Sequence, residues 1–340
     1  MSTATPEIQL RTSPHVHTGR SVAMIMRHVV YALLPLCIFS VWVFGISAFV
    51  LVITAVASCV LTEQLFCRLA GRPSSVGDFS VVITGLLLAL ILPPGFPLWM
   101  TAVGGFIAVG LGKMLFGGLG FNVFNPALVG RAFLQAAFPA AITGYTPPML
   151  ADRFQQFIPS TLAWPFLQPP ALDALSTATP LMKQKFDHVG TDTAALFFGQ
   201  VSGSAGETSA LLILLCGAYL IARKMMDWRI PAAMLGSAFF VGGAFHLMNA
   251  SRYPSPLFVL FSGGLMLGAL FMATDMVASP VTPLGVWIYG GLMGLLTVLI
   301  RFTGGLPEGV MYAILLGNAL SPLIDNLTQP RVYGTKARPS

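Results

Sequence analysis

Ten long runs of apolar residues constrain this chain more than any other feature of its sequence. They lie at 28–45, 47–66, 78–93, 98–116 and 123–141, and again at 209–222, 230–248, 256–274, 284–301 and 308–325. An α-helix needs about 20 apolar residues to cross the hydrocarbon core of a bilayer. The sequence therefore predicts an all-α polytopic membrane protein with about ten transmembrane helices.

The scarcity of charge supports this prediction. Only 9% of the 340 residues are Asp, Glu, Lys or Arg, whereas 55% are hydrophobic. Soluble domains carry roughly 25% charged residues, so this chain cannot cover a solvated surface. The composition excludes a soluble enzyme. It also argues against a nucleic-acid partner, despite a net charge of +6, and leaves the lipid bilayer as the surroundings of the chain.

The basic residues predict the orientation, because Lys and Arg concentrate in short cytoplasmic loops. With the N-terminus inside, the outer short turns hold only Arg252 and Arg301. The inner segments hold twelve basic residues, namely Arg11, Arg20, Arg27, Arg68, Arg72, Lys113, Arg223, Lys224, Arg229, Arg331, Lys336 and Arg338. Both termini are therefore expected on the cytoplasmic side of the membrane and the central polar segment on the outer side.

This pattern divides the chain into five parts. We predict a cytoplasmic tail at 1–27, a first five-helix membrane repeat at 28–141, an external segment at 142–208, a second five-helix repeat at 209–325 and a cytoplasmic tail at 326–340. A unit with an odd number of spans that occurs twice must be inverted in the membrane. The sequence echo is NPAL at 125–128 against NALSP at 318–322, and inverted repeats with broken helices are typical of transporters.

Charged residues in the apolar runs are candidates for an ion route. Six of them, Glu63, Asp78, Arg131, Asp275, Glu308 and Asp325, fall in or at the ends of runs. We interpret them as interfacial or helix-capping charges rather than ion carriers, and Asp275 is the most suggestive because it lies in a polar, Pro-broken stretch. His246 is interpreted as a packing or interfacial residue. The four cysteines lack a C-x-x-C spacing and are interpreted as small buried hydrophobes, with a cluster ligand assembled in three dimensions as the alternative.

The external segment contains the most informative motif, D-A-L-S-T-A-T-P at 173–180. It resembles the acceptor motif of flavin transferases, which join FMN through its phosphate to a threonine hydroxyl. Thr179 would be the phosphorylated acceptor, with Asp173, Ser176 and Ala178 completing the motif. The sequence STATP also occurs at 2–6, but that copy lacks the preceding acid and is predicted to be cytoplasmic. We therefore expect modification at Thr179 only.

Longer stretches resemble the RnfD/NqrB family of membrane flavin subunits. The stretches are SPH at 13–15, FNVFNPALVGRAF at 121–133, FMATDMVASPVTPLG at 271–285 and GLPEGVMYAILLGNALSPLID at 305–325. They cover nearly the whole chain in the family's order. The short N-terminal tail favours the RnfD branch, a component of the Rnf ion-translocating ferredoxin:NAD oxidoreductase, over the longer NqrB branch.

The resemblance implies a ten-helix fold of two inverted five-helix repeats and covalent FMN at Thr179. It also implies a non-covalent riboflavin near the cytoplasmic side in some members. Asn122 and Asn125 are our candidates for that site, since amides suit the donor and acceptor edge of a flavin ring. The alternative is that both asparagines cap or brace the break at Pro126. No residue is assigned as catalytic or as a metal ligand.

The implied function is electron relay between ferredoxin and NAD, coupled to translocation of Na⁺ or H⁺. The chain lacks a Gly-rich dinucleotide fingerprint after a strand, so it is expected to work only as a subunit beside other membrane and peripheral subunits, after maturation by a flavin transferase. Two alternatives stay open. One is an NqrB-like subunit of a sodium-pumping NADH:quinone reductase, and the other is a channel or transporter without redox chemistry.

Overall fold

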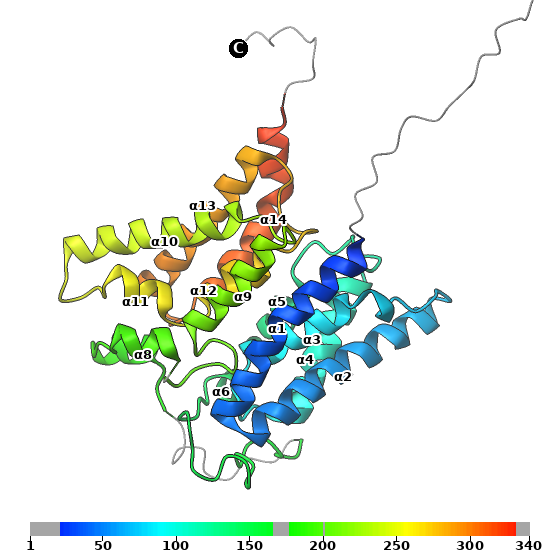
Figure 1. Cartoon of the computed structure of the whole chain (residues 1–340), viewed down its shortest axis with the longest axis horizontal. Coiled ribbons are helices and arrows are strands. Elements are labelled where there is room, and N and C mark those ends of the chain that lie inside the picture. Colours follow the sequence, from blue (N-terminus) through cyan, green and yellow to red (C-terminus); the bar gives the residue numbers. More distant parts are fainter. Residues whose placement is uncertain (1–20, 166–176, 200, 331–340) are drawn as a thin grey trace, which may run out of the picture.

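The computed structural model describes residues 21–165, 177–199 and 201–330, and in these ranges the chain is helical with no β-strand (Figure 1). The first half contains the following elements: α1 Val22–Phe44, α2 Ile46–Leu69, the short 3₁₀ turn η1 Val76–Asp78, α3 Ser80–Ile91, α4 Leu98–Val109, its π-helical continuation η2 Gly110–Met114, α5 Pro126–Ala137 and α6 Pro139–Ile142. Five helical segments, α1 to α5, therefore form at the positions of the first five apolar runs.

The second half begins with short helices in the external segment. These are α7 Pro180–Met182, its π-helical continuation η4 Lys183–Asp187, and α8 Thr193–Phe198. The remaining elements are α9 Ala210–Ala222, α10 Arg229–Met248, α11 Pro256–Phe261, α12 Leu265–Leu267, its π-helical continuation η5 Gly268–Met272, α13 Pro283–Thr303 and α14 Val310–Thr328.

Half of the ten predicted spans are shorter than a full crossing. Five helices, α1, α2, α10, α13 and α14, are long and apolar enough to span a membrane. By contrast, α3 and α5 have 12 residues each, which at 1.5 Å per residue is about 18 Å, against a hydrocarbon core of about 30 Å. The run at 256–274 is broken between Phe261 and Leu265. The all-α membrane fold is confirmed, with long helices surrounding shorter, interrupted ones.

The two halves repeat the same neighbour relations. In the first half α2 packs against α3 and α4, α4 packs against α5, and α1 packs against α3. In the second half α10 packs against α11, η5 and α13, α13 packs against α14, and α9 packs against α12 and η5. The broken α11–α12–η5 segment thus takes the place of α3. Because each unit has five segments, the second enters the membrane from the opposite side.

Equivalent elements of the two units meet in the middle of the molecule. The first segments, α1 and α9, contact each other, and so do the last, α5 and α14. At the second contact the Asn318 side chain, with its amide oriented by its neighbours, accepts the Asn125 backbone N–H at 3.0 Å and donates to the Tyr289 hydroxyl at 2.6 Å. Contacts between equivalent elements are expected next to a pseudo-two-fold axis.

The turn between α1 and α2 shows how the external segment packs on the membrane unit. Gly45 has φ 75°, and a Cβ there would lie 1.9 Å from the Arg153 carbonyl oxygen. The same carbonyl accepts the Ile46 backbone N–H at 2.9 Å. Only glycine allows this close approach. The segment that follows α6 therefore packs directly against the turn between α1 and α2.

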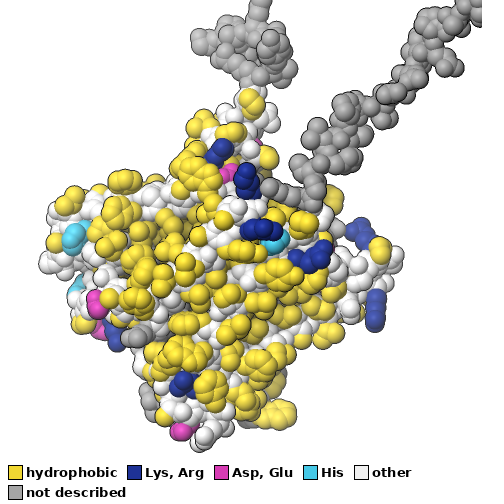
Figure 2. Space-filling view, viewed as in Figure 1, with side chains coloured by type: hydrophobic (Ala, Val, Ile, Leu, Met, Phe, Trp, Pro, Cys, Tyr) yellow, Lys and Arg dark blue, Asp and Glu magenta, His cyan; other side chains and the backbone are white. Residues whose placement is uncertain are grey.

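The outer surface is apolar, as a lipid-facing surface must be. Figure 2 shows a broad field of hydrophobic side chains, with Lys and Arg gathered towards its upper margin. Large side chains such as Leu247 and Leu327 are 88% and 87% exposed. The start of α1 and the end of α14 lie on one side of the molecule in Figure 1, and the segment after α6 lies on the opposite side. This arrangement agrees with the two termini sharing one face of the membrane.

Candidate functional site

Thr179, the predicted acceptor, lies directly before α7 as its N-cap. Its backbone is extended (φ −68°, ψ 159°), and its hydroxyl accepts the Met182 backbone N–H at 3.3 Å. The preceding Ala178 carbonyl accepts the Ser202 hydroxyl at 3.1 Å. The first turn of the α7–η4 segment therefore holds Thr179 in one conformation.

The rest of the motif is only partly described. Asp173 and Ser176 lie outside the described residues. Thr177 donates its backbone N–H to the Tyr145 carbonyl at 2.8 Å, and its buried hydroxyl has no partner. Thr179 is 8% exposed, so it is buried in the folded segment.

A small cavity of about 20 Å³ adjoins Thr179 and is bordered by Glu207, Gly263 and Glu308. This volume is enough for one water molecule. Gly263 has φ 62°, and a Cβ on it would lie 3.3 Å from both Glu308 Oε1 and Arg301 Nη2. The break between α11 and α12 thus brings two carboxylates and a guanidinium close to the predicted flavin site.

A buried ion cluster lies next to this cavity. Arg131 of α5 donates to Glu207 Oε1 at 3.2 Å and to Glu308 Oε2 at 2.5 Å. The side chains of Arg131, Glu207 and Glu308 are 8%, 3% and 23% exposed. Arg301 lies beside them and donates to the carbonyls of Val259 and Ser262 at 2.7 and 3.0 Å. The cluster connects α5, the last helix of the first unit, to the loop before α9 and to the loop between α13 and α14.

These contacts correct part of the sequence interpretation. Asp78 and Asp325 do behave as capping charges: Asp78 accepts the Ser80 backbone N–H, and Asp325 accepts that of Thr282 at the start of α13. Arg131 was wrongly interpreted as an interfacial or capping charge, because it is buried and forms ion pairs inside the protein. Glu308 lies in the loop before α14 with 23% of its side chain exposed, and it pairs with Arg131. Glu207 was not singled out at all. Its only signal was an acid two residues before an apolar run.

Glu63 was also wrongly interpreted as interfacial, since it is fully buried. Lys113 Nζ lies 2.7 Å from Glu63 Oε2 and donates to the Ser80 hydroxyl at 2.7 Å. The Ser75 hydroxyl donates to the second oxygen of the same carboxylate. Lys113 was assigned to a cytoplasmic turn on charge alone, whereas the π-helical end of α4 holds it in the protein interior.

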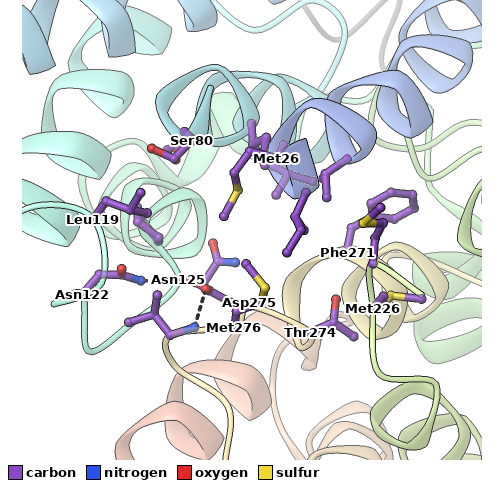
Figure 3. A pocket seen from close by; sticks show the side chains of 18 of the residues that line it. Met26, Ser80, Leu119, Asn122, Asn125, Met226, Phe271, Thr274, Asp275 and Met276 are labelled. Atoms are coloured by element: carbon purple, nitrogen blue, oxygen red, sulfur yellow. Dashed lines mark hydrogen bonds between the residues drawn. The ribbon is translucent and has the colours of Figure 1, made fainter. Parts of the chain in front are cut away.

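A second cavity, of about 100 Å³, lies on the side of the chain termini. Its polar wall is formed by Ser80, Lys113, Asn122, Asn125 and Asp275. Figure 3 shows Asn122 and Asn125 close to Asp275, with Met26 and Ser80 on other sides of the cavity. The structure thus brings together both asparagines and the acid that the sequence marked as most suggestive.

The capping alternative is confirmed for Asn125. Its Oδ1 accepts the backbone N–H groups of Ala127 and Leu128 at 3.1 and 3.4 Å, and its Nδ2 donates to the Met272 carbonyl at 3.3 Å. Asn122 instead donates to Asp275 Oδ2 at 3.2 Å. Both amides therefore connect the first unit to the end of η5 in the second unit.

The cysteines and His246 behave as predicted. Cys37, Cys59, Cys67 and Cys216 are all free and buried. His246 Nδ1 lies 2.8 Å from the Tyr253 carbonyl oxygen, which places it in local packing. Within the described ranges, no group of three or more His, Cys, Asp or Glu side chains is arranged to hold a metal ion.

Outside the membrane helices, burial lowers the pKa of Lys185 from its ordinary value. Lys185 lies on η4, one turn beyond α7. Its ammonium group donates to the carbonyls of Arg301, Gly304 and Leu306. Lys185 therefore holds the segment that begins at Thr179 against the end of α13.

Comparison with known proteins agrees with this architecture over almost its full length. A model of the NQR2, RnfD, RnfE family matches residues 9–334. The chain is 41% identical over 337 residues to the D component of the proton-translocating ferredoxin:NAD(+) oxidoreductase complex of Clostridium ljungdahlii, covering 96% of each chain. It is 41% identical over 331 residues to the D component of the Na(+)-translocating ferredoxin:NAD(+) oxidoreductase complex of Acetobacterium woodii, covering 96% of this chain and 95% of the relative.

A third relative is 38% identical over 346 residues. It is the D component of the ion-translocating oxidoreductase complex of Actinobacillus succinogenes, and the alignment covers 96% of this chain and 98% of the relative. The matches include all ten helical segments and the external segment. They cover nearly the whole length of this chain and of each relative rather than one shared domain.

Proposed function

This chain belongs to the NQR2, RnfD, RnfE family, and from that membership we propose that it is the flavin-bearing RnfD component of an ion-translocating ferredoxin:NAD oxidoreductase complex. The observation that carries the proposal is the 41% identity to two such components over 96% of this chain. The chain acts as one part of an electron-transfer complex and is inactive alone, because ferredoxin and NAD are handled by other subunits.

FMN is the proposed cofactor, attached by a phosphoester to Thr179. Three features support the fit: the acceptor-like sequence, the position of Thr179 at the start of the helical segment 180–187, and the cavity that adjoins it. Helix N-termini favour anionic groups such as a phosphate. When bound, FMN would exchange electrons either singly or in pairs, whereas the protein supplies position and electrostatics.

In-gel fluorescence of the denatured protein tests the attachment. We expect a fluorescent band at 36.1 kDa that disappears in Thr179→Val and persists in Thr177→Val and Thr5→Val. Thr177 is the matched control because it is a neighbouring threonine whose hydroxyl is also buried, and Thr5 tests the second STATP copy. A fluorescent Thr179→Val band, or flavin recovered by mass spectrometry on a peptide containing Thr5, would overturn the assignment.

Riboflavin at Asn122 and Asn125 is a separate proposal for the second cavity. The amide and hydroxyl groups suit a flavin edge, but about 100 Å³ is less than the roughly 300 Å³ typical of cofactor sites. Binding therefore requires displacement of flexible wall residues such as Met26 and Met226. The test is the amount of free riboflavin released by denaturation, which should fall in Asn122→Leu and remain in Thr179→Val.

Ion translocation is proposed to act at the boundary between the two units. Polar groups lie at this boundary near both faces of the membrane. Asn122 and Asp275 lie near the face of the chain termini, and the Arg131 cluster lies near the opposite face. Relatives at the same identity are named for protons and for sodium, so the ion has to be measured. Sealed vesicles carrying the complex should build a gradient during electron transfer. Sodium uptake that resists a protonophore would indicate Na⁺, and electron transfer with no gradient would refute coupling.

The proposed orientation places the termini in the cytoplasm and Thr179 outside the bacterial inner membrane. Single cysteines introduced at Ser251 and at Arg223 test it, since the four native cysteines are buried and contribute little background. A membrane-impermeant maleimide applied to spheroplasts should label the cysteine at 251 and spare the one at 223. The reverse pattern would invert the topology.

A further inference from the structure

The segment that follows α6 has large apolar side chains on its surface, although it lies at one end of the helical bundle. Residues 149–164 are the part of it that crosses the helix ends, and we call them the crossing segment. Its exposed large hydrophobic residues are Met149, Phe154, Phe157, Leu162 and Trp164, and Trp164 is 75% exposed. Single exposed apolar residues are ordinary, but a group of this kind marks a surface that meets lipid or a partner.

The backbone of the crossing segment is attached to the turn between α1 and α2. The Met149 N–H donates to the Val43 carbonyl at 3.0 Å, and the Ile158 N–H donates to the Ser47 hydroxyl at 2.9 Å. Gly45 packs against the same segment between these two contacts. The crossing segment therefore lies at the level where the first two membrane helices meet, on the side opposite to the chain termini (Figure 1).

Further along, the crossing segment covers the end of the short helix α3. The Ser160 hydroxyl donates to the Gly95 carbonyl at 2.7 Å, and the Thr161 carbonyl accepts the Leu98 backbone N–H at 3.1 Å. Because α3 has only 12 residues, it is too short to cross the full hydrocarbon core. The crossing segment therefore occupies part of the depth that α3 does not reach, which places its exposed side chains near the boundary of the lipid.

The exposed tryptophans lie where membrane proteins concentrate them. Trp and Tyr are enriched at both lipid–water interfaces, because each has an apolar ring and a polar N–H or O–H group. On the side of the termini, Trp228 and Trp287 are exposed near the starts of α10 and α13, with ring centroids 5.8 Å apart. On the opposite side Trp42 is exposed in the last turn of α1, and Trp164 adds a second exposed tryptophan there.

The polar groups of the crossing segment suit lipid headgroups. The Arg153 guanidinium lies 4.9 Å from the centre of the Phe154 ring, and the exposed neighbours Asp152, Gln155 and Gln156 are polar. A long basic side chain keeps its charge at the headgroup level while its apolar neighbours enter the acyl region. Figure 2 shows hydrophobic side chains continuing from the helices to the lower end of the molecule. This continuity favours lipid, rather than another protein, as the phase that covers the segment.

We propose that the crossing segment 149–164 lies in the lipid–water interface, with Phe154, Phe157, Leu162 and Trp164 among the upper acyl carbons of the adjacent leaflet. Irregular backbone is tolerated at this depth only where its polar groups have partners. Hydrogen bonds to α1, α2, α4 and the loop before α4 supply such partners. The segment thereby shields the end of α3 from lipid and holds this end of the molecule at a fixed depth.

Tryptophan quenching in the purified intact complex, reconstituted in phosphatidylcholine liposomes, tests this placement. Bromine atoms on the upper acyl carbons quench the tryptophans that they touch, and the emission of Trp164 is the difference between wild type and Trp164→Phe. We expect brominated lipid to lower this difference by about twofold, as for a side chain at the boundary of headgroups and acyl chains. Trp42→Phe provides the matched control, because Trp42 is exposed on the lipid-facing end of α1.

Acrylamide, a quencher dissolved in water, gives the reciprocal measurement. It should quench Trp164 about threefold less than it quenches N-acetyltryptophanamide in the surrounding buffer. The double variant Phe154→Ser and Phe157→Ser keeps the backbone contacts but lacks two apolar anchors, so acrylamide should quench Trp164 more strongly in it. Two results would overturn the proposal. Strong acrylamide quenching with no effect of brominated lipid would mean that the segment faces water, and protection from both quenchers would mean that another subunit covers it.

Discussion

The buried cluster around Arg131 leads to a strong prediction about stability. Arg131 is the shared partner of Glu207 and Glu308, with 8% of its side chain exposed. Replacing it with methionine keeps the bulk of the side chain but leaves two carboxylates without this cation. Removing one partner of a buried ion pair destabilises proteins by about 3–5 kcal/mol. The structure places this loss where the two membrane units meet.

The expected change in melting temperature follows from this energy. At about 2.1 cal/mol/K per residue, the 340 residues have an unfolding entropy of about 0.7 kcal/mol/K, so Arg131→Met should lower the melting temperature by about 4–7 °C. The assay is thermal unfolding of the purified protein in detergent, followed by tryptophan fluorescence. The matched control is Arg229→Met, which removes a partly exposed arginine at the start of α10.

A double variant separates loss of the ion pairs from a simple packing defect. Adding Glu207→Gln to Arg131→Met neutralises the carboxylate that is only 3% exposed. We expect the double variant to melt higher than Arg131→Met, because one uncompensated buried charge has been removed. Two results would contradict this role of the cluster. One is that Arg131→Met and the Arg229→Met control have the same melting temperature, and the other is that the double variant melts at a lower temperature than Arg131→Met.

Three smaller predictions use the same melting assay. Lys113→Met should destabilise by about 3–5 kcal/mol and be partly rescued by Glu63→Gln; equal melting of Lys113→Met and wild type would contradict the buried pair. Tyr289→Phe removes the hydroxyl bonded to Asn318 and should cost about 1–2 kcal/mol, a loss that an unchanged melting temperature would rule out. Burial lowers the pKa of Lys185 below 10.5, so the unfolded chain holds this proton more tightly. Its contribution to stability should therefore rise with pH between the lowered value and 10.5, and the rise should be absent in Lys185→Met.

The fold was largely readable from the sequence because the bilayer imposes a simple rule. Lipid leaves backbone polar groups no partner outside the helix, so each apolar run becomes helical. Run length alone did not reveal that α3 and α5 stop at 12 residues. The proline-rich connection 92–97 ends α3 early, and Asn125 starts α5 late by capping it.

The polar interior was less predictable, because sequence position does not give depth in a folded bundle. Glu63 lies near the end of α2, where an interfacial charge is ordinary, but the π-helical turn at Lys113 brings a cation to it from 50 residues away. Arg131, Glu207 and Glu308 are similarly drawn together from separate elements. Thr179 could be singled out only because its motif is local and resembles a known acceptor sequence.

The contact between Asn125 and Asn318 has a consequence for how the two halves can diverge. The two asparagines lie on the equivalent elements α5 and α14, which two identical five-helix chains would also bring together on meeting about a two-fold axis, although Asn125 caps the start of α5 and Asn318 lies in the middle of α14. Two identical chains could change that position only in both copies at once. Within one continuous chain the two places vary separately, and here they have separated: Asn125 lines a cavity, whereas Asn318 is 1% exposed and is occupied with Tyr289. Because the two halves can change independently at this contact, the two sides of the protein can acquire different binding sites.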